Sequence, residues 1–369
     1  MKKTVVGLLA HVDAGKTTLS EAILYGAGAI RRLGRVDDRD AFLDTFELER
    51  ARGITIFSKQ AVFSMGDTEV TLMDTPGHVD FSAEMERTLQ ILDYAVLVIN
   101  GADGIQGHTE TLWRLLKRYQ IPAVLFVNKM DQAGTDKERL MAELKDRLDE
   151  GCVDFGGWRA DGGEWNPGTD ERESFAENLA VCDEAVLETY LETGEIGREE
   201  IIRMTAGRKL FPVFFGSALK MKGIESFLRG LFEIVRAPKG SSSFGAKIYK
   251  ISRDSQGNRL THLKVTGGVL RVKDALIGEE KVNQIRIYSG SKYETVQEAQ
   301  TGTVCAVTGL LSSAPGQGLG AEAASELPVL EPVLTYRILL PEGTDVHKSL
   351  RDLRQLEEEE PELHILWEE

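Results

Sequence analysis

The stretch AHVDAGKT, residues 10–17, decides how the beginning of this 369-residue chain folds. It lies between the apolar run TVVGLLA and the amphipathic run GKTTLSEAILYGAG, which indicate a buried strand followed by a helix. A strand, a G-x-x-x-x-G-K-[ST] loop and a helix form a phosphate-binding site, and here Ala10 replaces the first glycine. Gly15, Lys16 and Thr17 still supply a turn, a charge and a metal-binding hydroxyl. The alternative is an ordinary glycine turn.

Residues 1–238 alternate between apolar strands and helices. Continuous apolar strands between helices predict a mostly parallel, doubly wound α/β sheet that is covered on both faces. About 80 residues separate Asp131 from the strand near Phe211, whereas a strand–helix–strand unit takes only ~30. We therefore expect an inserted subdomain at about residues 140–205.

The pattern changes after the Pro/Gly/Ser-rich linker APKGSSSFG, residues 237–245. Short alternating runs separated by Gly and Asp turns predict an antiparallel β-barrel over residues 242–330. Residues 332–369 read as strand, helix and strand, which is typical of the start of an α+β, ferredoxin-like domain. We expect the chain to be truncated there, because so short a fragment buries little apolar surface.

Two stretches after the helix that follows the loop carry further phosphate chemistry. DTPG, residues 74–77, ends an apolar strand; Asp74 can hold a Mg²⁺-bound water, and the Gly77 N–H can touch a γ-phosphate. RGITI, residues 52–56, contains Thr55, a candidate second hydroxyl ligand of Mg²⁺. The alternatives are a Pro-Gly turn and the start of a β-branched strand.

The stretch NKMD, residues 128–131, ends the strand AVLFVNK and predicts base recognition. Asn128 can bond the O6/N7 edge of guanine, and the Lys129 stem can pack on the base. The Asp131 carboxylate can accept from N1–H and the 2-amino group, a donor pair that adenine lacks. In GSALK, residues 216–220, the backbone N–H groups that can complete the O6 site are those of Ser217, Ala218 and Leu219.

These motifs follow one another in order, each at the end of an expected strand. The carboxyl ends of strands in an open α/β sheet meet at one crevice, so we predict one GTP-binding domain. The expected GTP-binding residues are Asp13, Ala14, Gly15, Lys16, Thr17, Thr18, Gly77, Asn128, Lys129, Asp131, Ser217, Ala218 and Leu219. The expected Mg²⁺ ligands are Thr17, Thr55 and, through water, Asp74.

His78 follows Gly77 directly and is the candidate catalytic residue. Many small GTPases place a glutamine near this point to orient the attacking water. A histidine can do the same, with a charge that changes near neutral pH. The alternative is a surface histidine after a turn.

Composition limits the other function classes. The net charge of −15 argues against a general basic nucleic-acid binder. The three cysteines, Cys152, Cys182 and Cys305, suggest neither a disulfide framework nor a metal site, which fits a reducing cytoplasm. No segment approaches the ~20 apolar residues that span a bilayer, so we expect no membrane association.

Taken together, AHVDAGKTT, RGITI, DTPGHVDF, NKMD and GSAL resemble the translational GTPases of the elongation factor G branch, in which Ala occupies the first loop position. The insertion and the barrel resemble the insertion and domain II of that branch. GAIRRLGRVD (28–37), ELERARGITI and NKMDQAGTD resemble most the tetracycline-resistance ribosomal protection proteins. This resemblance covers essentially the whole chain and is weakest in residues 140–205.

The resemblance implies a cytoplasmic, monomeric protein that hydrolyses GTP to GDP on the ribosome, with Mg²⁺ as cofactor. Ribosomal RNA would position His78, and ribosomal proteins would be further partners. Asp13 would hold a monovalent cation, K⁺ or Na⁺, and Val12 and Ile54 would form an apolar gate beside His78. The alternatives are a helix cap for Asp13 and core packing for Val12 and Ile54.

Ribosomal protection against tetracycline is the first functional hypothesis. An elongation-factor-G-like translocase or paralogue has the same chemistry and a different task. A GTP-switched binding module with little catalysis belongs to another class, and the presence of Lys16, Thr55 and His78 argues against it. An ATP-dependent phosphate-loop enzyme is disfavoured by Asp131.

Overall fold

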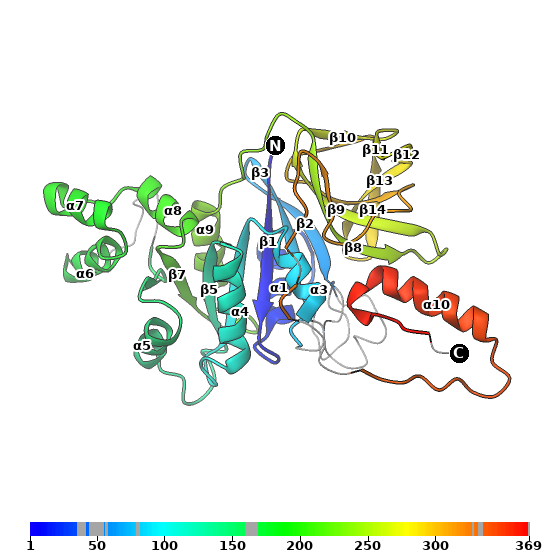
Figure 1. Ribbon diagram of the computed structural model, residues 1–369. Helices are drawn as coiled ribbons and strands as arrows, with labels where there is room; N and C mark the ends of the chain where they lie inside the picture. Colours follow the sequence, from blue (N-terminus) through cyan, green and yellow to red (C-terminus); the bar gives the residue numbers. More distant parts are fainter. Residues whose placement is uncertain are drawn as a thin grey trace. The chain divides into compact units, whose positions relative to one another are not determined.

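The computed structural model contains two compact units (Figure 1). One comprises residues 1–80 and 92–238, and the other comprises residues 81–91 and 239–369. The structure describes residues 1–34, 42–43, 55, 58–78, 82–158, 169–326, 328–330 and 335–367.

The first unit is built on a seven-stranded sheet with the order β2-β3-β1-β4-β5-β7-β6 among the described residues. Its strands are β1 (Lys2–Ala10), β2 (Lys59–Met65), β3 (Thr68–Asp74), β4 (Tyr94–Asn100), β5 (Ala123–Asn128), β6 (Cys152–Asp154) and β7 (Phe211–Phe215). Of the pairs that these seven strands form, only β2–β3 is antiparallel. The predicted, mostly parallel α/β sheet is therefore confirmed. The parallel strands are apolar along most of their length because both faces of the sheet are covered.

Helices connect these strands, and α6 and α7 lie at the left of Figure 1, farther from the sheet than α1 and α4. They are α1 (Lys16–Gly26), α4 (Gly107–Arg118), α5 (Lys137–Arg147), α6 (Thr169–Ala180), α7 (Glu184–Thr193), α8 (Arg198–Ala206) and α9 (Ile224–Ile234). Gly26 of α1 lies against α9: a Cβ there would approach Leu228 Cδ1 to 2.6 Å. The core combines residues of strands and helices, among them Val98 of β4, Phe126 of β5 and Phe227 of α9.

The interval predicted as an insertion contains β6, α6, α7 and α8. The apolar pattern of AENLAVCDEAVLETYLETG is helical throughout, but the stretch contains parts of two helices: α6 ends at Ala180 and α7 begins at Glu184. The break occurs because the Asp183 carboxylate accepts from the N–H groups of Ala185 (3.0 Å) and Val186 (3.3 Å), as an N-cap does. The short strand β6 was also unforeseen, and it extends the sheet beside β7.

The second unit is antiparallel. Its six-stranded sheet has the order β14-β13-β16-β9-β8-β17, and two-stranded sheets pair β10 with β15 and β11 with β12. The strands are β8 (Gly245–Arg253), β9 (Arg259–Gly267), β10 (Val269–Arg271), β11 (Ala275–Ile277), β12 (Glu280–Lys281), β13 (Gln284–Ser289), β14 (Lys292–Val296), β15 (Glu298–Gln300), β16 (Val304–Thr308) and β17 (Gly318–Gly320). Side chains such as Ile248, Leu263 and Val307 fill its core. The antiparallel β region expected after the linker is thus confirmed.

Helix α3 (Ser82–Leu89) belongs to this second unit, although it follows the DTPG stretch in the chain. The Lys250 ammonium of β8 pairs with the buried Glu84 carboxylate at 2.7 Å. The Glu86 carboxylate accepts from the backbone N–H groups of Val329 (2.8 Å) and Leu330 (3.0 Å). Buried charges require such partners, so these contacts hold α3 firmly to the antiparallel unit.

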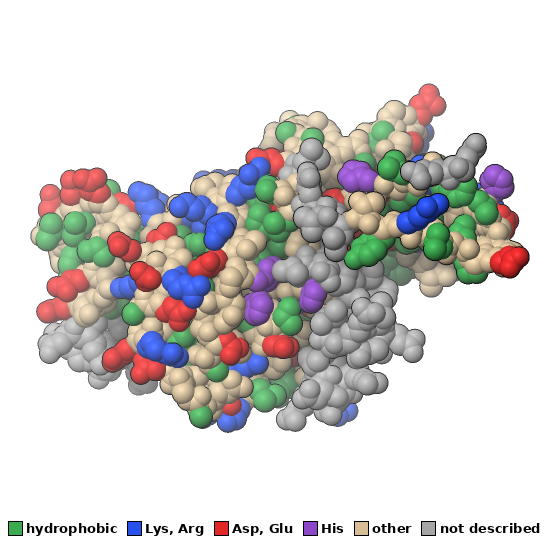
Figure 2. All heavy atoms as spheres, turned by 60° about the horizontal axis from the view of Figure 1, so that its bottom comes forward, with side chains coloured by type: hydrophobic (Ala, Val, Ile, Leu, Met, Phe, Trp, Pro, Cys, Tyr) green, Lys and Arg blue, Asp and Glu red, His purple; other side chains and the backbone are tan. Residues whose placement is uncertain are grey.

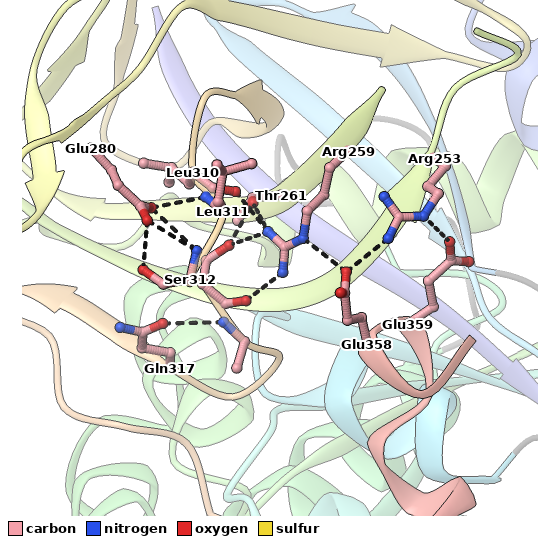
Figure 3. Close-up of polar contacts among 12 residues, drawn as sticks. Arg253, Arg259, Thr261, Glu280, Leu310, Leu311, Ser312, Gln317, Glu358 and Glu359 are labelled. Atoms are coloured by element: carbon pink, nitrogen blue, oxygen red, sulfur yellow. Dashed lines mark hydrogen bonds and ion pairs between the residues drawn. The ribbon is translucent and has the colours of Figure 1, made fainter. Parts of the chain in front are cut away.

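Helix α10 (Val346–Glu359) and the 3₁₀ helix η2 (Pro361–Leu363) are attached to the β8–β9 hairpin. In Figure 3, Glu358 lies between two guanidinium groups, 2.8 Å from Arg253 Nη2 and 3.3 Å from Arg259 Nε. Arg259 also donates to the Leu310 carbonyl at 2.7 Å and to the Ser313 carbonyl at 2.5 Å. One arginine thus joins the helix to the loop that follows β16.

Of the strand–helix–strand pattern expected for residues 332–369, the described residues contain only the helix. Residues 335–340 and 364–367 contain no strand, and residues 331–334 lie outside the described part of the chain. A strand is defined by its hydrogen-bonded neighbour, and no edge in the described residues pairs with these segments. No described helix is both long enough and apolar enough to cross a membrane.

Candidate nucleotide-binding site

The loop between β1 and α1 has the geometry of an anion cradle. β1 ends at Ala10 and α1 begins at Lys16, and between them Asp13 (φ +62°) and Gly15 (φ +88°) adopt left-handed conformations. The Ala14 N–H donates to the His11 carbonyl at 3.2 Å and closes the turn. The first N–H groups of a helix have no partner within the helix, so they are available to a phosphate.

Three of the predicted phosphate and metal residues meet at this loop. The Lys16 ammonium contacts Asp74 Oδ1 directly and donates to Thr55 Oγ1 at 3.2 Å. Thr55 Oγ1 in turn donates to Asp74 Oδ2 at 3.3 Å. All three are buried, with exposed fractions of 8% for Lys16, 6% for Thr55 and 0% for Asp74. Residues from three separate sequence motifs therefore form one polar cluster.

The DTPG turn is fixed against the loop by its own residues. The Thr75 hydroxyl donates to the Leu8 carbonyl of β1 at 2.7 Å. A Cβ on Gly77 would lie 3.2 Å from the Ala10 carbonyl oxygen and 3.8 Å from Lys16 Cε. Gly77 consequently lies directly against the loop, and its small size permits that approach.

The donor set at this cluster fits Mg²⁺. Magnesium prefers carboxylate, hydroxyl and water oxygens and is usually bound through one or two carboxylates together with phosphates. Asp74 is fully buried and already has a cation, the Lys16 ammonium, as its neighbour. A buried carboxylate needs a cationic partner, and the oxygens of Asp74 and Thr55 are of the kind that could hold Mg²⁺ as that partner.

Asn128 joins the phosphate loop to the motifs predicted to bind the base. It ends β5 and is 2% exposed. Its Nδ2 donates to the Ala14 carbonyl at 3.0 Å, and its Oδ1 accepts from the Ala218 N–H at 2.9 Å. The Met130 N–H donates to the Gly216 carbonyl at 3.0 Å. The AHVDAGKT, NKMD and GSALK stretches therefore form one continuous site.

Asp131 lies beyond this junction and carries an ion pair that the sequence analysis missed. Its Oδ2 is 2.9 Å from the Nζ of Lys220, the last residue of GSALK. Lys220, and after it the Ser217 hydroxyl, lower the pKa of Asp131 to about 2. Its carboxylate is thus ionised, as acceptance from guanine requires. The only sequence signal for Lys220 was its place next to a base-binding loop.

His78 acts electrostatically on His108, a histidine that the sequence pattern did not single out. The rings of His11 and His108 are 5.9 Å apart between centroids. The pKa of His108 is lowered by burial and by its nearness to His11 and His78. Figure 2 shows several histidine side chains close together near the middle of the view, with others well apart from them. The imidazole of His78 thus lies in a histidine-rich environment.

The remaining predicted residues are placed as follows. Thr17 and Thr18 occupy the first turn of α1, and Lys129, like Gly15, has a left-handed backbone (φ +63°). Asp13 is exposed, and Leu219 is 55% exposed. Val12 is half-buried, whereas Ile54, its proposed gate partner, lies outside the described residues. The gate and the monovalent-cation role of Asp13 stay predictions.

Comparison with known proteins agrees with this geometry. The family described as the elongation factor Tu GTP binding domain matches residues 1–237. An oxytetracycline resistance protein of Streptomyces rimosus is 33% identical over all of this chain and 60% of its own length. Elongation factor G 2 of Syntrophus aciditrophicus is 31% identical over 99% of the chain and 64% of its own length.

Elongation factor G of Mycoplasma pneumoniae is 30% identical over 96% of the chain and 61% of its own length. A crystal structure of a Thermus thermophilus protein superposes with a TM-score of 0.80 at 25% identity, covering 98% of this chain and 61% of that one. The chain thus spans 60–64% of the length of these curated relatives.

Proposed function

Because this chain belongs to the elongation factor Tu GTP-binding domain family, we propose that it binds GTP at this site and hydrolyses it to GDP and phosphate when stimulated by the ribosome. The observation that carries the proposal is the convergence of Lys16, Thr55 and Asp74, joined through Asn128 to the GSALK loop. Phosphate and base chemistry then lie at two ends of one site.

At the phosphate end, binding exchanges partners within the buried cluster. Lys16 leaves Asp74 for the β- and γ-phosphates, and the N–H groups at the start of α1 surround them. Asp74, through water, and the hydroxyls of Thr17 and Thr55 would hold Mg²⁺, which neutralises charge on the phosphate oxygens. The Gly77 N–H would meet the γ-phosphate, and the position of Gly77 against the loop supports this.

For hydrolysis, we assign to His78 the orientation of the attacking water. The residue follows Gly77, so its imidazole is tied to the position of the γ-phosphate. Ribosomal RNA would hold the His78 imidazole in that position, which would account for stimulation by the ribosome. Val12 and Ile54 would act as an apolar gate beside His78, and Asp13 would hold K⁺ or Na⁺ next to the phosphates.

At the base end, Asp131 selects guanine by accepting from N1–H and the 2-amino group. Asn128 and the N–H groups of Ser217, Ala218 and Leu219 complete the O6 edge, and the Lys129 stem packs on the ring. Asn128 already uses its amide to hold Ala14 and Ala218, which supports a role in keeping both loops in place.

The first test is GTP turnover with and without ribosomes. We expect ribosomes to accelerate hydrolysis by the full-length protein, and His78→Ala to reduce the stimulated rate by roughly 10²- to 10⁴-fold, the usual contribution of a positioned general acid–base group. GTP affinity should be unchanged in this variant. Equal stimulated rates in variant and wild type would remove His78 from catalysis, whereas hydrolysis that ribosomes do not accelerate would favour the alternative of a GTP-switched binding module with little catalysis.

The biological task that we propose is protection of the ribosome against tetracycline. It is supported by the Streptomyces rimosus relative, named an oxytetracycline resistance protein and 33% identical. The two elongation factor G relatives, at 31% and 30%, support an alternative, a translocase-like factor. Expression of the complete gene in a tetracycline-sensitive strain separates the two, because only the first raises tetracycline tolerance.

The same proposal includes the organisation of the chain. Residues 1–238 would be the GTP-binding domain with its insertion at about 140–205, residues 242–330 the β-barrel domain II, and residues 332–369 the start of domain III. The protein would act as a cytoplasmic monomer whose partners are ribosomal RNA and ribosomal proteins. Sedimentation of the purified protein tests whether it is a monomer.

A further inference from the structure

Lys220 contacts the carboxylate that the site offers to a guanine. Its Nζ lies 2.9 Å from Asp131 Oδ2, and the two side chains are 52% and 19% exposed. The two residues come from different loops, after β5 and after β7. The contact therefore depends on how those loops are held together.

The loop that carries Lys220 is rigidly built. Ser217 and Lys222 exchange two backbone hydrogen bonds, of 2.9 and 3.0 Å, and the Lys220 N–H donates to the Ser217 carbonyl at 3.2 Å. Gly223, with φ +76°, ends the loop, and a Cβ there would come within 2.4 Å of the Phe215 carbonyl oxygen. Lys220 is thus presented from a fixed backbone.

The partner loop is tied to the same place. The Met130 N–H donates to the Gly216 carbonyl at 3.0 Å, and Asn128 accepts from the Ala218 N–H at 2.9 Å. These bonds on either side fix the distance between Asp131 and Lys220. An exposed ion pair by itself adds little to folding stability. The contribution left to this pair is to orient the Asp131 carboxylate.

We propose that Lys220 is a positioning residue for guanine selection, holding the Asp131 carboxylate in the orientation that accepts from N1–H and the 2-amino group. A carboxylate has about four lone-pair sites, so one oxygen can retain the ammonium while both oxygens accept from a base. The carboxylate is then oriented before the nucleotide arrives, and less ordering remains to be done on binding. The proposal rests on the base-selecting role of Asp131 given above.

Guanine and hypoxanthine nucleotides separate this role from general electrostatics. Both bases present N1–H, but only guanine also presents a 2-amino group. A misoriented carboxylate loses the two-bond geometry, so GDP affinity should fall more than IDP affinity. A general loss of positive charge near the phosphates would instead weaken both nucleotides equally.

The experiment measures GDP and IDP dissociation constants by titration calorimetry on the full chain. Lys220→Met keeps the apolar stem and removes the charge, and Lys220→Arg restores a cation. Lys222→Met is the matched control, because Lys222 is an exposed lysine of the same loop with no ion pair among the described residues. We expect Lys220→Met to raise the GDP dissociation constant roughly 3- to 10-fold, within the range for the net contribution of an ordinary hydrogen bond.

In Lys220→Met the GDP/IDP preference should shrink, whereas Lys220→Arg should restore it and Lys222→Met should leave it unchanged. Unchanged GDP affinity would overturn the proposal, and so would tighter binding, which would show that Lys220 competes with the base. Lys220→Gln serves as a second neutral variant should the first unfold.

A parallel titration of Asp131→Asn keeps this proposal distinct from the one on which it rests. If Asp131→Asn binds GDP normally, base selection by Asp131 is wrong. If Asp131→Asn weakens GDP binding and Lys220→Met does not, only the positioning role of Lys220 fails.

Discussion

The two ends of the nucleotide site carry the same ion pair in opposite surroundings. At the phosphate end, Lys16 and Asp74 are 8% and 0% exposed. At the base end, Lys220 and Asp131 are 52% and 19% exposed. Burial decides what each pair can do: a buried carboxylate must always have a cation, whereas a solvated carboxylate needs one only for orientation.

This difference in burial gives the two lysines different proposed roles. Lys16 can leave Asp74 only if another cation arrives, which links nucleotide binding at that end to Mg²⁺. Lys220 can stay beside Asp131 throughout, because water and the base share the remaining lone pairs. On the proposed function, the phosphate end would exchange partners, whereas the base end would already be organised for its ligand.

The largest expected effect breaks the buried pair. Lys16→Met leaves the buried Asp74 carboxylate without its ammonium, and removing one partner of a buried pair typically costs ~3–5 kcal/mol. Urea unfolding of the nucleotide-free chain should show a loss of this size. Lys220→Met, the matched control at the exposed pair, should cost only ~0–1 kcal/mol. Equal losses in the two variants would contradict the comparison.

The next effect comes from the glycine between the two ends. Gly15 has φ +88°, and a Cβ there would approach Asn128 Nδ2 to 2.4 Å. Gly15→Ala should therefore cost the ~1–2 kcal/mol of a left-handed alanine and also displace the amide that joins both ends. GTP affinity should fall together with the free energy of unfolding.

Gly28→Ala provides the control for backbone strain alone. Gly28 has φ +74°, but a Cβ there meets nothing within 4 Å. In this variant the free energy of unfolding should fall only by the ~1–2 kcal/mol that a left-handed alanine costs, and the nucleotide affinity should be unchanged. If both glycine variants lost the same stability and bound GTP equally well, Asn128 would not be under steric control of Gly15.

A smaller and more selective effect is expected at the base end. Asp131→Asn replaces an acceptor by an amide and leaves the guanine donors unmatched, which should weaken GTP by roughly 10- to 10²-fold. Xanthine, which presents a carbonyl where guanine has its amino group, should gain affinity. Competition titrations with GTP and XTP measure both changes. Unchanged GTP affinity would remove Asp131 from base selection.

Much of this site could be predicted from the sequence because each motif ends an apolar strand. Parallel strands bring their carboxyl ends to one edge, so the order of Lys16, Asp74 and Asn128 along the chain was enough to place them together. Lys220 could not be predicted, because its contact depends on the fold of one exposed loop. The break before α7 was missed for a similar reason, since Asp183 looks like any acid until it caps a helix.

The fold of the second unit was predicted in class and less well in detail. Alternating runs revealed β8 and β9, but short strands such as β14 and β17 contain few apolar residues and gave little signal. The attachment of α3 to the antiparallel unit was also invisible, because its buried charges Glu84 and Glu86 find their partners in distant segments. Long-range pairing of this kind leaves no local pattern.

The smallest expected effect concerns the pH dependence of the exposed pair. Lys220, followed by Ser217, lowers the pKa of Asp131 to about 2 from an ordinary 3.8. A lowered carboxylate pKa contributes stability and base acceptance that are fully present above the unfolded pKa and lost as pH falls through the folded one. Removal of Lys220 should move that loss to higher pH.

Carbon NMR of the Asp131 carboxyl measures this shift directly. We expect a titration midpoint near pH 2 in the parent chain and in Lys222→Met, and a midpoint nearer 3.8 in Lys220→Met. At pH 4 the change in ionised Asp131 is less than about two-fold, so binding assays near neutral pH should not detect it. An unmoved midpoint would mean that Lys220 does not hold the carboxylate in solution, and the two ends of the site would then differ in more than burial.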